Sequence, residues 1–186
     1  MKKHISLPLS KSNAAQLRAG DSVLLTGILY TARDAAHKRL NEMQLQWDPL
    51  PFNPINAAIY YVGPTPAPDG MALGSAGPTT SSRCDKYTPS LLNEGVTVLI
   101  GKGKRSQDVK QSIIDNQAVY LAATGGAGAM LARCIKTSKV IAFDDLGTEA
   151  IRELYVEDFP AVVIYDSHGG DYYESARQAY LDSIKK

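Results

Sequence analysis

Residues 97–123 read TVLIGKGKRSQDVKQSIIDNQAVYLAA, and their pattern decides the fold class of the chain. The run opens and closes with short apolar stretches that are typical of buried strands. Between them, residues 106–116 favour a helix, with Ser106 as its N-cap residue. A strand, a helix and a second strand in this order form the crossover unit of a parallel sheet.

The same alternation extends in both directions from this run. Because strands and helices alternate from residue 85 onward, we predict an α/β fold with a mostly parallel sheet and crossover helices. The elements expected in this part are a helix over residues 85–95, a glycine-started helix over 125–136, strands over 139–145, 154–158 and 160–166, and a closing helix over 174–186.

The N-terminal third is predicted to be richer in strands. Residues 22–32 favour a strand in which Gly27 marks a bulge or a close backbone approach. The other expectations there are a mobile start that contains His4, a helix over 33–46, a strand over 57–63 and a loop over 63–80 with a short strand around Met71–Leu73. We interpret residues 1–186 as one layered domain.

Composition excludes several classes of protein. The 186 residues are 44% hydrophobic and 21% charged, which fits a soluble globular protein. The 20 basic and 19 acidic residues leave a net charge of +1, so no basic field favours nucleic acid. No run of about 18 apolar residues predicts a membrane span, and no signal peptide is indicated.

Cysteine usage favours the cytoplasm. Cys84 and Cys134 lie far apart without CxxC spacing, as free thiols of a reducing compartment do. Two cysteines are too few soft ligands for a structural zinc site or an iron–sulfur cluster held by this chain alone. We therefore predict no metal ligand in the chain.

Two glycine-rich runs fail as nucleotide motifs. Around residues 100–106, IGKGKRS, Val96 stands five positions before Gly101, where a phosphate-binding loop needs its first glycine, and Gly103 stands where it needs Ser or Thr. Residues 125–132 carry Leu131 in place of the third glycine of a dinucleotide fingerprint. Both runs nevertheless follow strands, where backbone N–H groups favour an anion. For Gly125 and Gly126 taken alone, tight packing of helix on sheet is the better explanation.

The histidines do not indicate a hydrolase. No G-x-S-x-G elbow accompanies them, so a serine triad is not supported. His37 lies within a predicted helix, where a surface or core-edge position and a functional one are equally consistent with the sequence.

Cations follow several of the predicted strands. Arg33 follows the strand over 22–32, Arg83 follows the corner GPTT, and Lys102 follows the strand TVLIG. Each of these three side chains, taken alone, is consistent with a solvated surface charge. Together with the hydroxyls of Thr79 and Thr80 at strand ends, however, they suit a small dicarboxylate, because guanidinium binds carboxylate bidentately and lysine adds a point charge.

Several blocks in this order resemble the β subunit of iron–sulfur class I fumarate hydratases and the related L-tartrate dehydratase β subunit. The resemblance covers roughly residues 5–175, and single-chain fumarases carry the same region as their C-terminal domain. The blocks are TARDAAHKRL, YYVGPTP, GSAGPTTSSRCDKYTP, LIGKGKRS, GGAGAMLA, IAFDDLGTEAI and VEDFPAVVIYD.

This resemblance implies a swivelling β/β/α domain and the reversible hydration of fumarate to L-malate. It also implies a [4Fe-4S] cluster held by three cysteines of a partner α subunit, whose fourth iron acts as a Lewis acid on the substrate. The chain would then form a hetero-oligomer and contribute part of a shared active site, which accounts for its few cysteines.

The resemblance also assigns roles to residues. Arg33, Arg83 and Lys102 match positions that contact substrate, and Thr79 matches the residue proposed to take the C3 proton of malate. A threonine hydroxyl is a poor base unless a cation lowers its pKa or an acidic residue of the partner relays the proton. Cys84 replaces the methionine usual in the family, and we expect it to pack rather than to bind the cluster.

Two alternatives remain open. A tartrate dehydratase β subunit keeps the chemistry and changes the substrate, although the blocks at residues 60–70 and 81–89 favour the fumarase members. A non-catalytic carboxylate-binding module would keep the fold without a partner. Retention of all four site residues argues against such a module.

Overall fold

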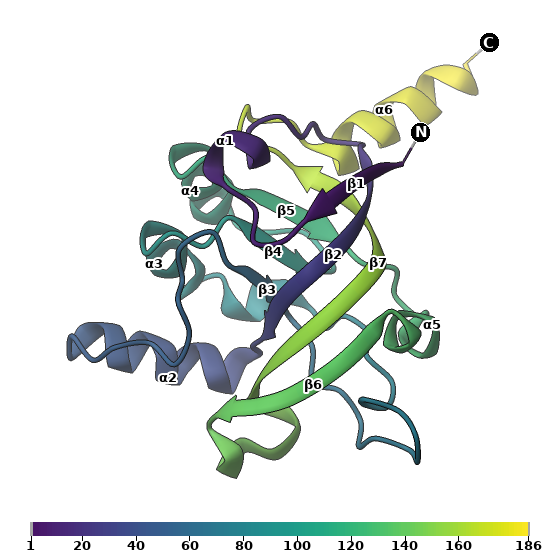
Figure 1. Cartoon of the computed structure of the whole chain (residues 1–186). Helices are drawn as coiled ribbons and strands as arrows, with labels where there is room; N and C mark the ends of the chain where they lie inside the picture. The colour runs from purple at the N-terminus through teal and green to yellow at the C-terminus, as the bar shows by residue number, and fades with distance from the viewer. Residues whose placement is uncertain (1, 186) are drawn as a thin grey trace.

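The computed structural model describes residues 2–185 and shows an α/β fold built on a mixed seven-stranded sheet (Figure 1). The strand order is β1-β2-β3-β4-β5-β7-β6, and β2 also pairs with β7. The strands are β1 (Lys3–Ser6), β2 (Ser22–Thr31), β3 (Ala58–Tyr60), β4 (Val98–Gly101), β5 (Val119–Ala122), β6 (Ile135–Ala142) and β7 (Ile151–Tyr165). The helices are α1 (Lys11–Ala14), α2 (Asp34–Leu45), α3 (Thr88–Asn93), α4 (Gln107–Asp115), α5 (Gly128–Arg133) and α6 (Tyr172–Ser183), with 3₁₀ segments η1 (Ser81–Cys84) and η2 (Asp144–Glu149).

The expectation of a mostly parallel sheet is correct only for the first five strands. β1 to β5 pair in parallel, whereas β7 runs antiparallel to β2, β5 and β6. A parallel crossover needs about a dozen residues or more, and only residues 143–150 connect β6 to β7, so these strands form an antiparallel pair. The two strands predicted over 154–158 and 160–166 are parts of the single strand β7.

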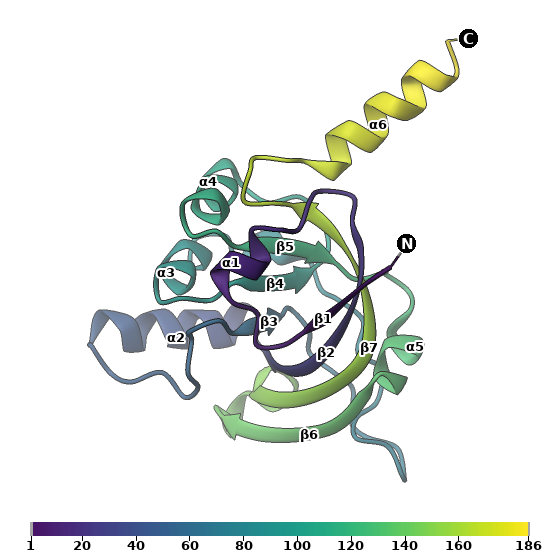
Figure 2. The same cartoon turned by 45° about the horizontal axis from the view of Figure 1, so that its top comes forward.

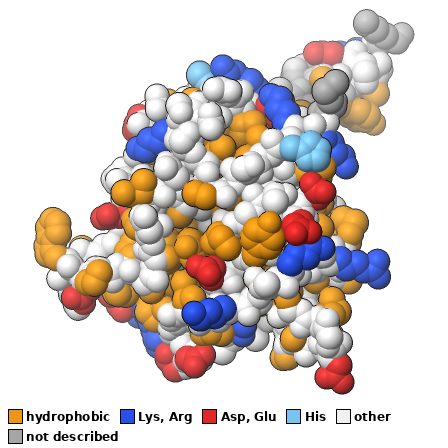
Figure 3. All heavy atoms as spheres, in the orientation of Figure 1, with side chains coloured by type: hydrophobic (Ala, Val, Ile, Leu, Met, Phe, Trp, Pro, Cys, Tyr) orange, Lys and Arg blue, Asp and Glu red, His pale blue; other side chains and the backbone are white. Residues whose placement is uncertain are grey.

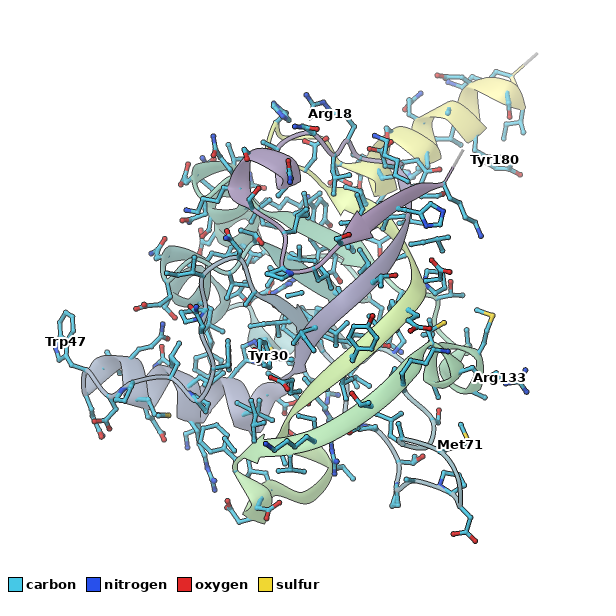
Figure 4. All side chains as sticks on the ribbon, viewed as in Figure 1. Arg18, Tyr30, Trp47, Met71, Arg133 and Tyr180 are labelled. Atoms are coloured by element: carbon cyan, nitrogen blue, oxygen red, sulfur yellow. The ribbon has the colours of Figure 1, made fainter. Side chains whose placement is uncertain are left out.

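Three further predictions were wrong. The predicted mobile start is a strand, in which His4 is in register with Leu24. No strand forms at Met71–Leu73, and Met71 lies on a loop that projects from the body of the molecule (Figure 4). The predicted helix over 125–136 is shorter, because its last residues belong to β6.

The sequence predictions around β2 and α4 are confirmed. The register of β2 with β7 shifts between Leu25 and Gly27, and Gly27 has a φ of +133°. A Cβ on Gly27 would collide with the backbone oxygen of Leu7, so this position requires glycine. Ser106 caps α4 by accepting a hydrogen bond from the Val109 N–H group at 3.4 Å.

The core has two parts, one on each face of the central strands. Helices α2, α3 and α4 cover one face of β3, β4 and β5, while β1, β2, β7 and β6 curve around the other (Figure 2). Ile59, Leu99 and Tyr120 pack beneath the helices, and their sequence neighbours Tyr60 and Ile100 pack toward the curved strands. Burial on both faces explains why these strands are continuous apolar runs. The swivelling β/β/α layering stays a prediction.

Two helix ends project from this core. Trp47, just after α2, is 93% exposed, and Tyr180 on α6 is 66% exposed (Figure 4). On the face shown in Figure 3, acidic and basic side chains are interspersed. Within residues 2–185, none of the helices has the length and apolar character needed to cross a membrane.

Candidate active site

The carboxyl ends of β2, β3, β4 and β5 lie side by side. Thr31 is in register with Tyr60, Tyr60 with Ile100, and Gly101 with Ala122. Ligands of open α/β sheets bind beyond the carboxyl ends of parallel strands. The segments that follow these strands therefore meet at one edge. We call it the site edge, and it comprises residues 32–33, 61–63, 79–80, 102–103 and 123–126.

Thr79 is anchored beside the end of β3. Its backbone N–H group and its hydroxyl group both donate to the carbonyl oxygen of Tyr61, at 2.8 and 2.9 Å. Because the hydroxyl hydrogen is directed at this carbonyl, the lone pairs of Thr79 Oγ1 remain available to another group. The GPTT corner thus holds a half-buried hydroxyl at the site edge.

Lys102 is joined to the same corner. Thr80 and Lys102 form a parallel β-bridge, and the Ser81 N–H group donates to the Lys102 carbonyl at 3.1 Å. The Lys102 N–H group in turn donates to Ser81 Oγ at 3.1 Å. The exposed side chain of Lys102 passes over Gly125, since its Cδ lies 3.9 Å from where a Cβ on that glycine would stand. The structure therefore joins Lys102 to Thr80 and Ser81, the two residues that follow Thr79.

The two arginines occupy different surroundings. Arg33 follows β2 directly at the N-cap position of α2, and its Nη2 lies 3.2 Å from Glu149 Oε1. Arg83 lies on η1, one short turn beyond the corner, with an exposed side chain that forms no ion pair within residues 2–185. The backbone thus brings three predicted site residues to one edge and the fourth next to it. A single cleft lined by all four stays a prediction.

A buried ion pair between Arg105 and Asp85, which the sequence analysis did not predict, stabilises the segment that follows the GPTT corner. The side chain of Arg105 has no exposed surface, and its Nε donates to Asp85 Oδ1 at 2.6 Å. Its two other nitrogens donate to Tyr61 Oη at 3.2 Å and Thr88 Oγ1 at 2.7 Å. Burial opposes the charge of Arg105, but Tyr61 and Asp85 outweigh burial and raise the pKa of the guanidinium.

This network connects the two loops that carry Arg83 and Lys102. Asp85 Oδ2 accepts a hydrogen bond of 2.6 Å from the Ser106 N–H group, so one carboxylate joins the end of η1 to the start of α4. Tyr120 adds a second connection, since its hydroxyl lies 3.0 Å from both Ser81 Oγ and the Gly103 carbonyl. Twenty residues separate Asp85 from Arg105. Such a spacing does not indicate a contact, so the ion pair could not be predicted. The sequence showed only that Asp85 and Arg105 each lie in a block that carries the family resemblance.

His37 is a buried neutral residue. Its Nδ1 lies 2.8 Å from the Arg33 carbonyl oxygen, and its ring packs beside that of Tyr61 with centroids 5.1 Å apart. Burial lowers the pKa of His37 to about 4, so the ring is uncharged at neutral pH. The side chain therefore supports the start of α2 from inside the core.

The donor atoms of this chain do not fit an iron–sulfur cluster. Cys84 is 2% exposed and packs in the core beneath the helices, as expected, and burial raises the pKa of its thiol to about 12. Cys134 lies elsewhere in the fold, at the C-cap position of α5 just before β6. Within residues 2–185, no three His, Cys, Asp or Glu side chains gather as metal ligands would.

Comparisons with known proteins identify the family. Residues 1–176 match the family model described as Fumarase C-terminus. The chain is 38% identical to fumarate hydratase 2 of Leishmania major over 93% of its length, and 38% identical to the aerobic class I fumarate hydratase of Escherichia coli K12 over 81%. It covers 31% and 28% of those two proteins, so it spans about a third of such relatives.

A shorter relative matches the chain from end to end. The putative L(+)-tartrate dehydratase subunit beta of Methanocaldococcus jannaschii is 35% identical over 96% of this chain and 94% of its own length. The family model matches residues 1–176, and these relatives are 35–38% identical to the chain. The chain belongs to the fumarase C-terminus family, together with class I fumarate hydratases and the L-tartrate dehydratase β subunit.

Proposed function

We propose that the chain is the β subunit of an iron–sulfur hydro-lyase that reversibly hydrates fumarate to L-malate in the cytoplasm. It supplies Arg33, Arg83 and Lys102 as clamps for the substrate carboxylates and Thr79 for proton transfer. A cluster-bearing α subunit completes the site. The observation that carries this proposal is the hydroxyl of Thr79, anchored at the site edge next to Thr80, which bridges to Lys102, in a chain with fumarate hydratase relatives.

The proposed residues suit the charges that the reaction develops. Fumarate and malate carry two negative charges at neutral pH, and three cations stand at or next to the site edge. When a base takes the C3 proton of malate, negative charge develops on that carbon and spreads into the adjacent carboxylate. Cations already in place around this carboxylate stabilise the charge without rearrangement. Thr79 takes the C3 proton and passes its own hydroxyl proton to a carboxylate of the partner, or reacts as an alkoxide where a nearby cation lowers its pKa.

The cluster belongs to the proposed partner, because the cysteines of this chain do not suit it. When bound there, it would activate the substrate hydroxyl group. This chain contributes binding, orientation and the proton-transfer residue. The relative that matches over its whole length is described as a subunit, which supports a separate partner for this chain as well.

Reconstitution tests the proposal. The purified chain, a candidate α subunit with three cluster-binding cysteines and their anaerobically prepared complex are each assayed for loss of malate. We expect turnover only from the complex. Turnover by this chain alone at the rate of the complex would exclude a shared site, and a stable complex that converts no dicarboxylate would exclude the hydro-lyase function.

Tartrate is the second candidate substrate. The M. jannaschii relative, described as a putative tartrate dehydratase subunit, supports it through its coverage of nearly both whole chains. The reconstituted complex therefore needs to be assayed on L-malate and L-tartrate in parallel. A higher kcat/KM for malate supports the fumarase assignment, and the reverse order replaces it with the tartrate assignment.

A further inference from the structure

The guanidinium of Arg33 is confined on two sides. On one side lies Gly63, just after β3, where an added Cβ would stand 2.9 Å from both Cδ and Nη1 of Arg33. On the other side lies Glu149, whose Oε1 is 3.2 Å from Arg33 Nη2. The side chain of Arg33 is 22% exposed, so it has few alternative orientations. Its orientation is therefore set by this chain itself.

Glu149 is itself fixed in place. Its second oxygen, Oε2, accepts a hydrogen bond of 3.1 Å from the Ala35 N–H group in the first turn of α2. Arg33 occupies the N-cap position of that helix but makes no side-chain cap bond, so Glu149 performs this role from η2. One carboxylate thus joins the start of a helix to a guanidinium.

Arg33 keeps unused hydrogen-bonding capacity in this arrangement. Glu149 Oε1 engages Nη2 at 3.2 Å and Asp34 Oδ1 lies 3.7 Å from the same nitrogen, while the buried Nε–H group has no acceptor within residues 2–185. A buried donor without a partner is uncommon, and a charged one especially so. The guanidinium is therefore oriented by Glu149 but not saturated by its acidic neighbours, and it keeps donor capacity for a substrate carboxylate.

We propose that Glu149, with Gly63 opposite, is a positioning residue that orients Arg33 for a substrate carboxylate. This inference rests on the proposed function, in which Arg33 contacts the dicarboxylate. Glu149 does not compete with the substrate, because moving away would break its bond to the Ala35 N–H group. It stays in place and shares Arg33 with the substrate, so its effect falls on binding of the dicarboxylate.

Glu149→Gln tests this role in the reconstituted complex, because glutamine keeps an acceptor for the Ala35 N–H group, removes the charge of residue 149 and leaves that of Asp34 beside Arg33. We expect KM for malate to rise about fivefold with kcat changed less than about twofold, the pattern of lost binding. The control is Asp145→Asn on the same segment, whose ion pair with Arg39 is exposed. In an Arg33→Ala background, Glu149→Gln should add nothing, because both act through one group.

A second readout uses the free chain and needs no activity. The side-chain ¹⁵Nε signal of Arg33, identified by its loss in Arg33→Lys, should shift in Glu149→Gln and in Gly63→Ala but not in Asp145→Asn. An unchanged signal in Glu149→Gln would overturn the positioning role. So would a lower KM, which means competition, or an additive effect in the Arg33→Ala background. A shifted signal with an inactive complex would instead reject the proposed function and leave the positioning of Arg33 intact.

Discussion

Asp85→Ala should be severely destabilising, because it leaves a charged Arg105 buried without its partner. The Arg105 side chain has no exposed surface and lies 2.6 Å from Asp85. Losing this charged hydrogen bond costs about 1.5–3 kcal/mol, and losing the one from the Ser106 N–H group about 1 kcal/mol more. Removing one partner of a buried ion pair generally costs about 3–5 kcal/mol. We therefore expect a loss of roughly 3–4 kcal/mol, a large share of the stability of a typical domain.

The assay is equilibrium unfolding in urea at neutral pH, in which a lower midpoint at unchanged m reports the loss of stability. Asp145→Ala is the matched control, because it removes an acidic partner from an exposed arginine and should leave the midpoint unchanged. Replacing both members, as in Asp85→Ala with Arg105→Met, removes the orphaned charge and should be less destabilising than Asp85→Ala alone. A loss below about 1 kcal/mol for Asp85→Ala would refute this reasoning.

Three further outcomes follow from the site. Burial lowers the pKa of His37 to about 4, against 6.5 for an unperturbed histidine. Between these two values the unfolded chain binds a proton that the folded chain does not bind. The free energy of unfolding should therefore fall, by up to roughly 3 kcal/mol, as the pH drops from about 6.5 to about 4. His37→Gln should reduce the difference in urea midpoint between pH 7 and about pH 4.5, and an unchanged difference would contradict this pKa. A maleimide should label Cys134 in the native chain and Cys84 only on unfolding, as mass spectrometry would show. Arg83→Lys should abolish most activity of the complex without changing its unfolding midpoint, since it removes a bidentate contact from an exposed position; full activity would exclude that contact.

The sequence predicted those parts of the fold that depend on local patterns. The run over 97–123 was correct as strand, helix and strand, because apolar periodicity and the Ser106 cap act within a few residues. The direction of β7 was not predictable in this way. Pairing direction depends on which strand lies beside which, and β7 meets β2 and β5, both distant in sequence. Connection length was the one local clue, because residues 143–150 are too few for a crossover helix.

The candidate site also contains features that the sequence predicted and one that it did not. The expected approach of Thr79 to Lys102 rested on two strand ends at one edge, and the bridge between Thr80 and Lys102 agrees with it. Glu149 was not predicted, because its relation to Arg33 arises from η2 folding back against the start of α2. A carboxylate that positions a cation has no fixed spacing from it along the chain. Only the folded structure shows such a partner.

Solvent exposure at the site edge is a physical reason to expect that the proposed site is completed by a second surface. Arg83 and Lys102 are both exposed. In water, a carboxylate 4 Å from such a cation gains only about 1 kcal/mol, whereas at an effective dielectric constant near 20 the same contact gains about 4 kcal/mol. A partner that excludes water from this edge would thus strengthen each clamp severalfold without moving any residue of this chain. Dielectric screening therefore adds to the proposed lack of the partner's cluster as a reason to expect no activity from the isolated chain.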